Sequence, residues 1–407
     1  MRWEYPAPHP GQTQSRPATA HFRRAHPIMN SVGASDFTIA QVHPDTREMR
    51  DFHKLPLALQ ARDEMWIPPL MIERRAALSA RKNPYFRHAE AAFFLARRDG
   101  RPVGRISAQI DRLEQPGIGH FGLLTAEPDA SLIGALLGAA ETWLRDKGVR
   151  HVTGPFNLSI NQEAGLLVSG HDSPPMLMTP HDQPHLAQMI ERFGYAKERD
   201  LLAYLYRTEA EPPDDLGRIL DRRLPKNVIL RPLRKSQYAA ELRVAIEIFN
   251  DAWSKNWGFV PLTEAEMDHM AEQMKPLVHE RLVWFAELGG EPVGFIACLP
   301  NLNEAIADLG GRLFPFGWVK LLWRLKVVKP RSGRVLLMGI RSGPRTSLVG
   351  GILITHLMEA IRREALALSI EKLEMSWILE DNLPMRRLAE AAGGRAYKTY
   401  RIYGKAL

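Results

Sequence analysis

The chain has 407 residues, of which 45% are hydrophobic and 25% charged, and its formal net charge is +8 at pH 7. This length predicts two or three domains, and the apolar content is sufficient for two hydrophobic cores. The single cysteine, Cys298, excludes an internal disulfide and favours a reducing compartment. No apolar run reaches the roughly 18 residues of a membrane-spanning helix.

Residues 1–35 are expected to form a disordered N-terminal tail. The first 28 residues are rich in Pro, His, Arg and Thr and lack the apolar segment of a signal peptide. Because Met29 follows them directly, we favour a mis-assigned translational start or a disordered tail over a functional arm.

A similar sequence motif occurs twice in the chain, as FFLARRDGRPVGRI at 93–106 and as VWFAELGGEPVGFI at 283–296. Each copy reads as two apolar strands joined by a tight Asp-Gly or Gly-Gly turn. A repeat of this length predicts a duplicated α/β unit rather than a solenoid, whose repeats are shorter. We therefore expect two tandem α/β units with mixed sheets, at 36–207 and 227–407. The Pro-rich stretch 208–226 would be a linker with a short helix.

The elements of the second unit can be read in chain order. The pattern predicts a helix at 237–254, a hairpin at 282–299, a buried strand at 335–340, a helix at 352–368 opened by Gly350-Gly351, a strand at 372–379, a short helix at 384–392 and a last strand at 397–407.

This order of elements resembles the GNAT acyltransferase superfamily, in two tandem copies over nearly all of 36–407. The resemblance implies a splayed strand pair that holds acyl-CoA, with the pyrophosphate on backbone amides where the next helix begins. A helix N-terminus is an anion site because its amides are unpaired and the dipole is positive there. That loop would be 343–353, with Arg345, Gly350 and Gly351 as candidate cofactor residues. Leu348 stands where the family usually has a glycine, so the loop is degenerate, and an ordinary glycine turn remains the alternative.

The corresponding loop of the first copy, 125–137, carries the acids Glu127 and Asp129 and has no cation. We therefore expect the first copy to have lost CoA binding and the second copy to have kept it.

A second GNAT signature lies near the C-terminus. Asn382 and Leu388 match the family pattern, which implies that Asn382 contacts the cofactor, but Ala389 replaces the tyrosine that protonates the leaving thiolate. Tyr400 is our candidate substitute. Its neighbours Tyr397 and Tyr403 remain alternatives, as does protonation by water.

Polar side chains mark candidate substrate sites in both units. The segment 249–261 contains Asn250, Trp253, Asn256 and Trp257, which suit the wall of an apolar substrate site. A helix end with core tryptophans is the alternative. In the first unit, the segment 154–170 contains Asn157, Asn161 and Glu163; Asn157 and Glu163 are substrate-binding candidates, although a turn network is the commoner role.

Two carboxylates are candidate general bases. Glu380 ends the strand beside the expected cofactor gap and could accept a proton from an attacking amine, and Glu304 after the hairpin is a second candidate. No histidine pair has convincing metal-ligand spacing, because Pro184 between His181 and His185 favours a surface turn. We expect no metal.

The segment between Leu309 and Met358 has no acidic residue and many cations. Within 313–329, an apolar face with Trp318 lies opposite Lys320 and Arg324. This pattern is typical of a helix that lies in an anionic membrane interface, and a helix packed on its own domain is the alternative. The net positive charge fits the same partner, although RNA or CoA phosphates would also suit it. No nucleic acid is expected.

The segments 154–170, 174–184, 249–261 and 377–382 also resemble a narrower group, the GNAT-like ceramide synthases of Gram-negative bacteria. The resemblance implies transfer of a fatty acyl group from acyl-CoA to the amine of a sphingoid base. It also implies a cytoplasmic enzyme, peripheral on the inner face of the inner membrane. Backbone amide near Gly339 and Ile340 would hold the oxyanion. The alternatives are an acetyltransferase for another amine, a tRNA-dependent aminoacyl transferase and a non-catalytic acyl-CoA-binding protein.

Overall fold

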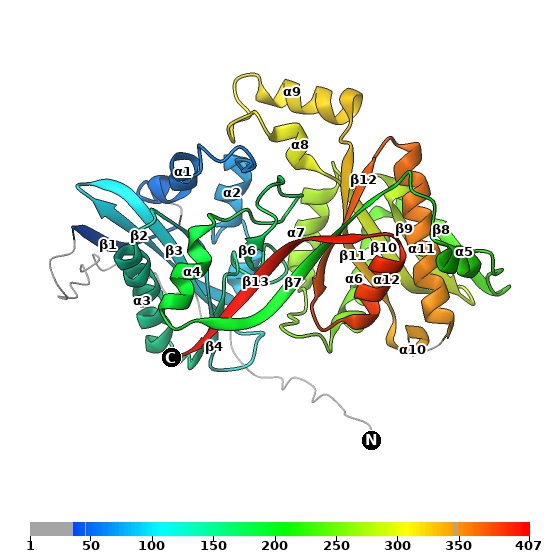
Figure 1. The fold of residues 1–407 in the computed structure, drawn as a ribbon, viewed down its shortest axis with the longest axis horizontal. Coiled ribbons are helices and arrows are strands. Elements are labelled where there is room, and N and C mark those ends of the chain that lie inside the picture. The colour runs from blue at the N-terminus through cyan, green and yellow to red at the C-terminus, as the bar shows by residue number, and fades with distance from the viewer. Residues whose placement is uncertain (1–35, 45, 346–347) are drawn as a thin grey trace, which may run out of the picture.

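The computed structural model describes residues 36–44, 46–345 and 348–407 (Figure 1). The expected tail, 1–35, lies outside the described residues. The strands of the first half are β1 (Phe37–Val42), β2 (Ala89–Arg98), β3 (Arg101–Asp111), β4 (Ile118–Ala126), β5 (His151–Gly154), β6 (Leu166–Ser169) and β7 (Ala196–Arg207). Those of the second half are β8 (Val228–Pro232), β9 (Val283–Leu288), β10 (Glu291–Pro300), β11 (Ser332–Ile340), β12 (Lys372–Leu379) and β13 (Arg395–Ala406).

Helices connect these strands in both halves. The first half has α1 (Met49–Leu59), α2 (Met71–Ala77), α3 (Ala130–Asp146) and α4 (His185–Arg192), followed by α5 (Asp214–Leu220) in the expected linker. The second half has α6 (Tyr238–Trp253), α7 (Glu264–Met274), α8 (Leu302–Ile306), α9 (Gly317–Trp323), α10 (Ser342–Arg345), α11 (Leu348–Ala367) and α12 (Leu383–Ala391).

The two copies of the repeated motif form the two predicted hairpins, β2–β3 and β9–β10. Both residues of each turn have positive φ, at 48° and 76° for Asp99-Gly100 and at 63° and 89° for Gly289-Gly290. Turns of this kind match the twist of paired strands and favour Asp-Gly and Gly-Gly. The strands and helices given above confirm the predicted mixed α/β fold, and those of the second unit follow the predicted order.

Helices cover both faces of the sheet. Alternate residues of β9 and β10 point to opposite faces, so Phe285 and Phe295 pack with α6, whereas Ala286 and Ile296 belong to the core beneath α11. In the first half, α1 and α3 pack on β3 and β4 in the corresponding places. The two units thus repeat one architecture.

The described strands form one 13-stranded sheet because the two units exchange their last strands. The order is β1-β2-β3-β4-β5-β13-β7-β12-β11-β10-β9-β8, with β6 on β13. Strand β7 of the first unit bonds to β12 of the second, and β13 of the second bonds to β5 of the first. Tyr204 and Tyr206 of β7 therefore lie in the core of the second half, and Tyr403 of β13 in that of the first. Figure 1 shows the two long strands running across both halves.

This exchange predicts that the first half does not fold alone. A fragment of residues 36–226 lacks β13 and exposes the apolar residues of β7, so we expect no cooperative thermal unfolding transition from it. Co-expression with residues 227–407 is expected to yield a co-purifying, cooperatively unfolding pair. Intact protein cut only within 208–226 is the control and should stay assembled. Cooperative unfolding of the isolated fragment would show that the exchange is not required.

Candidate active site

Strands β11 and β12 separate partway along the sheet and leave a cleft. They pair in parallel only through Ser332–Val335 and Lys372–Met375, after which β11 continues on β10 and β12 on β7. A cavity of about 920 Å³ lies in this gap, with residues 335–340 on one wall and 375–379 on the other. The splayed strands implied by the GNAT resemblance are therefore present in the second unit.

The open edge of β11 presents backbone groups to the cleft. The backbone amide of Arg341 donates to Val293 O of β10. Because the backbone groups of successive residues in a strand point to opposite sides, the N–H and C=O groups of Met338 and Ile340 point away from β10, toward the gap. Consistent with this, the Trp253 indole donates to Met338 O at 3.1 Å. Gly339 lies against α6, where a Cβ atom would come within 3.1 Å of the Ala252 methyl. The two predicted residues Gly339 and Ile340 both line the cleft.

Two helix N-termini border the same cleft. Gly350 and Gly351, in the first turn of α11, are lining residues, and nothing would lie within 4 Å of a Cβ atom on Gly351. Asn382 also lines the cleft and caps α12, where its side chain accepts a bond from the Met385 amide at 3.3 Å. Arg345 is the last residue of α10, and its side chain lies outside the described residues.

The segment after α6 forms the aromatic wall that the sequence predicts. Trp253, Asn256 and Trp257 line the cleft, and Asn250, one turn earlier on α6, does not. The Asn250 Oδ1 atom is buried without a partner. The structure thus brings together three of the four candidates in this segment.

Asn157 and Glu163 lie elsewhere, in a cavity of about 120 Å³ in the first half, which we call the N-terminal pocket. The Asn157 amide donates to Glu163 at 2.6 Å and accepts from the Leu123 amide at 2.8 Å. Glu163 also pairs with Arg74 at 2.9 Å. The Asn161 amide donates to Val260 O and so ties this loop to the segment after α6.

The predicted general bases face away from the cleft. Glu380 pairs with Lys197 at 2.6 Å and accepts from the Asp200 amide at 3.1 Å. Glu304 accepts from the Arg331 amide at 2.8 Å and from the Ser332 hydroxyl. Neither carboxylate is a lining residue of the cleft. Both are held by partners at strand ends.

Tyr400, the candidate acid, is completely buried and packs edge-on against Trp377, which lines the cleft. Burial raises the pKa of its phenol, which makes it a poor proton donor to solvent but leaves it protonated. Tyr403 donates to Glu191 in the first half, and Tyr397 donates to Glu374. Of these three tyrosines, Tyr397 alone bonds to the polar network described next.

A buried network that the sequence analysis missed lies under the cleft wall. Ser376 lines the cleft, and its hydroxyl donates to Glu374 at 2.5 Å and accepts from Arg334 Nε at 2.7 Å. Glu374 is 0% exposed, and the Arg334 guanidinium lies 3.5 Å from its carboxylate and 4.6 Å from the centre of the Trp377 ring. The sequence did contain one indication of this network. Glu374 and Ser376 alternate with the apolar residues Leu373, Met375 and Trp377, so the two polar side chains share one face of an otherwise apolar strand.

At the start of α3, the equivalent position in the first unit, carboxylates occupy the helix N-terminus. Asp129 caps the helix and accepts from the amides of Ser131 and Leu132 at 2.9 and 3.2 Å. Arg98 bridges Asp129 and Glu127, at 2.7 Å to each.

Over the described ranges, no group of three or more His, Cys, Asp or Glu side chains is arranged to hold a metal ion.

Comparisons with known proteins agree with this geometry. No family model matches the chain. It is 50% identical over 365 residues to the bacterial ceramide synthase of Caulobacter vibrioides, which covers 88% of this chain and 95% of that protein. It is 45% identical over 363 residues to Protein YghO of Escherichia coli, which covers 88% of this chain and 93% of that protein.

Solved structures share the fold at low sequence identity. A tandem GNAT protein from the clavulanic acid biosynthesis pathway matches with a TM-score of 0.55 and 15% identity, over 91% of this chain and 98% of that one. A GCN5-related N-acetyltransferase from Sphaerobacter thermophilus matches with a TM-score of 0.50 and 14% identity, over 91% and 96%.

The fold is that of a tandem GNAT protein, and the chain is an N-acyltransferase. It belongs to the family of the bacterial ceramide synthase of Caulobacter vibrioides, as its identity to that protein over most of both chains shows. Both the GNAT resemblance and the narrower resemblance found in the sequence are confirmed.

Proposed function

We propose that this enzyme transfers a long-chain fatty acyl group from acyl-CoA to the amine of a sphingoid base. The observation that carries the proposal is the 50% identity to a bacterial ceramide synthase, together with a large and mainly apolar cleft between the separated strands. Acyl chains and sphingoid bases are both apolar along most of their length, so a cleft of this kind suits both substrates.

In this proposal acyl-CoA lies across the gap between β11 and β12. Its pyrophosphate meets the open amides at the start of α11, beside Gly350 and Gly351, where the helix dipole favours an anion. The thioester carbonyl lies against the free edge of β11, where the Met338 and Ile340 amides point into the gap and can hold the oxyanion.

The buried network replaces Glu380 and Glu304 as the proposed base. The Ser376 hydroxyl has a second lone pair that can accept a proton from the attacking amine while it passes its own proton to Glu374. The adjacent Arg334 stabilises the carboxylate before transfer and orients the hydroxyl.

The reaction balances with these groups. The amine nitrogen attacks the thioester carbon, the carbon–nitrogen bond forms, the carbon–sulfur bond breaks, and the electron pair leaves on the CoA sulfur. The amine proton goes to the Ser376–Glu374 pair. The thiolate takes its proton from water, since Ala389 occupies the usual tyrosine position and is completely buried.

The first unit is proposed to support the cleft rather than bind a second acyl-CoA. The carboxylates of Asp129 and Glu127 occupy the N-terminal end of α3 and would repel a pyrophosphate there. Its loop carbonyls Leu177 O and Met178 O accept from the Arg334 guanidinium, at 2.8 and 3.3 Å.

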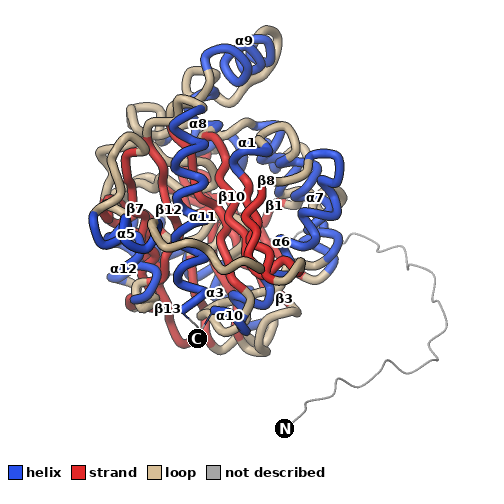
Figure 2. The backbone as a smooth tube through the Cα atoms, turned by 90° about the vertical axis from the view of Figure 1, so that its right-hand side faces the viewer, coloured by secondary structure: helices blue, strands red, loops and turns tan. Residues whose placement is uncertain are grey.

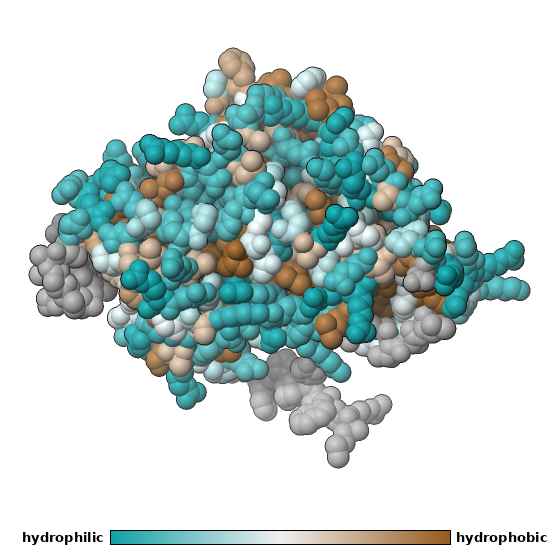
Figure 3. All heavy atoms as spheres, viewed as in Figure 1, coloured by the Kyte–Doolittle hydropathy of each residue, from teal (hydrophilic) through white to brown (hydrophobic). Residues whose placement is uncertain are grey.

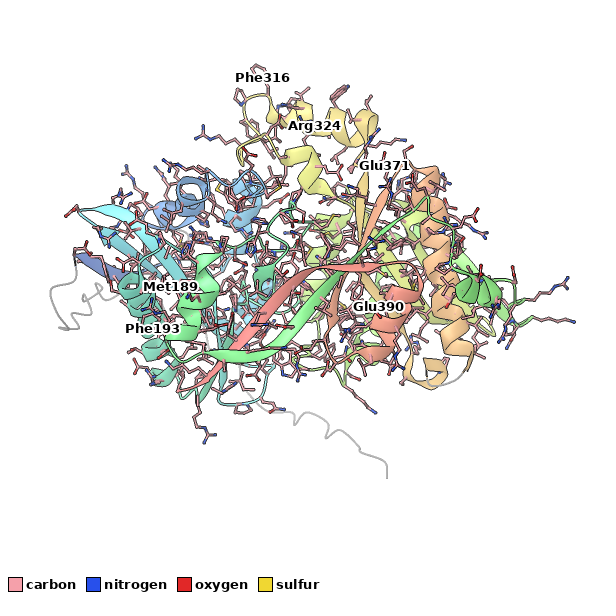
Figure 4. The ribbon with its side chains drawn as sticks, in the orientation of Figure 1. Met189, Phe193, Phe316, Arg324, Glu371 and Glu390 are labelled. Atoms are coloured by element: carbon pink, nitrogen blue, oxygen red, sulfur yellow. The ribbon has the colours of Figure 1, made fainter. Side chains whose placement is uncertain are left out.

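We further propose that the segment around α9 contacts an anionic membrane surface. No helix in the described part of the chain has the length and apolar character needed to cross a bilayer. The segment instead stands off the body of the protein (Figure 2) and places hydrophobic side chains at its outer end (Figure 3). Phe314 and Phe316 are 75% and 77% exposed, and Phe316 lies at the tip (Figure 4).

The apolar face predicted for 313–329 is divided in the structure. Leu321 and Leu325 pack inward on the core formed with α8, whereas Trp318, Leu322 and Val328 are exposed. Lys320 and Arg324 both pair with Asp308. Three further cations of the same segment are exposed, namely Arg312, Lys326 and Lys329. Exposed aromatic residues flanked by cations are the features that partition into an anionic interface.

The substrate proposal predicts sphingoid-dependent thiol release. Purified enzyme in detergent micelles should release free thiol from palmitoyl-CoA when sphinganine is present and form the N-acyl product. Sphinganine-free reactions are the control. Tight acyl-CoA binding with no sphinganine-dependent release would assign the enzyme another amine, and absence of acyl-CoA binding would disprove the proposed cleft.

The relay predicts that Glu374→Gln lowers kcat about a hundredfold or more, because general-base assistance contributes that much. Ser376→Ala should have a similar effect. Acyl-CoA affinity should stay unchanged, which separates lost proton transfer from a damaged cleft.

Glu380→Gln is the matched control, since this carboxylate ends the same strand but faces Lys197. We expect it to retain turnover and lose only a surface ion pair. Loss of turnover in Glu380→Gln with normal turnover in Glu374→Gln would instead support the assignment made from the sequence.

The membrane proposal predicts that the double variant Phe316→Ser/Trp323→Ser binds vesicles containing phosphatidylglycerol at least about tenfold more weakly. Turnover in micelles should not change. The control is Ile229→Ser/Leu366→Ser, which removes two other exposed apolar side chains from surfaces away from α9. Equal vesicle binding by both double variants would reject the α9 surface as the membrane contact.

A further inference from the structure

The N-terminal pocket, of about 120 Å³, is separate from the acyl-CoA cleft. It lies between α1, α2, the middle of β3, the end of β4 and the loops that follow β5 and β6, and Asn303 of α8 also lines it. Its floor is polar and its rim is apolar. The proposed reaction uses none of its side chains, so their arrangement requires a separate explanation.

Arg105 on the floor is a buried arginine with no carboxylate partner in the described part of the chain. The residue is 7% exposed, and its Nη1 donates to the Phe52 carbonyl at 2.8 Å. Its guanidinium also lies 4.9 Å from the centre of the Phe52 ring, and its Nε atom is buried without a partner. By contrast, Arg231 has two carboxylates within 2.6 Å. A buried guanidinium without an anion is costly unless a ligand supplies one.

Two buried histidines in the same pocket also have unsatisfied nitrogen atoms. His53 and His181 are 7% and 6% exposed, and the Nδ1 atom of each is buried without a partner. The Nε2 atom of His181 lies 3.1 Å from the Asp63 carboxylate, so of the two rings only His53 has no carboxylate partner. Burial, together with the positive charges of Arg105, Arg75 and Arg74, lowers the pKa of His53 to about 4. Burial is the largest cause of this shift, and the three arginines add a positive potential at His53 that favours an anion there.

Neither Glu163 nor Asp182, the carboxylates that line the pocket, pairs with Arg105, and Asp63 pairs with His181 instead. Glu163 is already saturated, because Arg74 and the Asn157 amide both bond to it. Asp182 accepts from the Leu167 amide at 3.0 Å and has no cation within ion-pair distance in the described residues. Its burial raises its pKa to about 7, so it carries only part of a negative charge near neutrality.

The rim of the pocket is apolar and continues toward the segment proposed to meet the membrane. Trp66, Ile67, Pro69, Met71 and Met178 line it. Ile67 and Met178 pack in the same core as Leu313, Leu321 and Leu325, next to α9. The Met71 amide donates to Gly311 O at 3.0 Å, which fixes the rim to the loop before α9.

We propose that the N-terminal pocket is a second ligand site, which binds the carboxylate or phosphate head group of a single-chain amphiphile at Arg105. The head group accepts from Arg105 Nε and from His53 Nδ1, and the chain leaves along the apolar rim toward α9. The site does not depend on the proposed acyltransfer, because it shares no lining residue with the cleft.

The test is ¹⁹F NMR of the full-length protein labelled with 5-fluorotryptophan, since Trp66 lines this pocket and Trp253, Trp257 and Trp377 line the cleft. The Trp66 signal is assigned by its loss in Trp66→Phe. Laurate below its micellar concentration, inorganic phosphate and dodecylamine are titrated separately. Binding in the cleft and binding in the pocket are thereby read from different signals.

We expect laurate to shift the Trp66 signal, phosphate to shift it at higher concentration, and dodecylamine to leave it unchanged. Arg105→Gln should weaken the laurate response at Trp66 at least about tenfold, since one charge-assisted bond is lost. His53→Gln provides a second variant should Arg105→Gln fold poorly. Arg231→Gln, which alters a buried but fully paired arginine, is the matched control and should bind as the wild type.

Each other result counts against the proposal. No shift at Trp66 with any probe at millimolar concentration would overturn the site. A stronger response to dodecylamine than to laurate would overturn the assigned charge of the ligand. Equal affinity for phosphate and laurate would overturn the amphiphile and leave a site for a free oxyanion.

Discussion

The separation of β11 from β12 after Val335 and Met375 is the feature on which the active site depends. A sheet interior normally satisfies every backbone group through neighbouring strands. Here the edge of β11 beyond this point faces a cleft, where the Trp253 indole bonds to one carbonyl and the remaining groups are available to a ligand. In the proposed reaction, the opening in the sheet therefore also provides the site for the thioester.

The exchange of last strands keeps that opening in place. Strand β7 of the first unit pairs with β12 at Lys372–Met375 and again at Ile378–Leu379. The first unit therefore holds the second wall of the cleft even where β11 has separated from it. The buried Arg334 makes the dependence mutual, since it bonds to loop carbonyls of the first unit and to Ser376 at the cleft wall. The first unit, in which Asp129 caps the helix N-terminus, thus supports the wall of the cleft in the second unit.

Charge is distributed differently in the two cavities. Under the cleft, Arg334 and Glu374 compensate one another within a closed network, which suits a site that moves a proton. In the N-terminal pocket, Arg105 has no such partner, which suits a site that receives an anion. Both cavities lie in a molecule whose α9 segment projects apolar side chains, so the whole arrangement fits amphiphilic ligands.

The sequence by itself determined the duplication, both hairpins, the order of elements and the aromatic wall at Trp253 and Trp257. These follow from local patterns, because turn residues and the periods of strand and helix act over a few neighbouring positions. Only the tertiary structure decided the strand exchange. The residue patterns of β7 and β13 predict strands, but they would allow each strand to pair in either half. It also decided that Glu374 rather than Glu380 lies under the cleft. Burial of a carboxylate depends on which distant segments pack against it, and no local pattern records that.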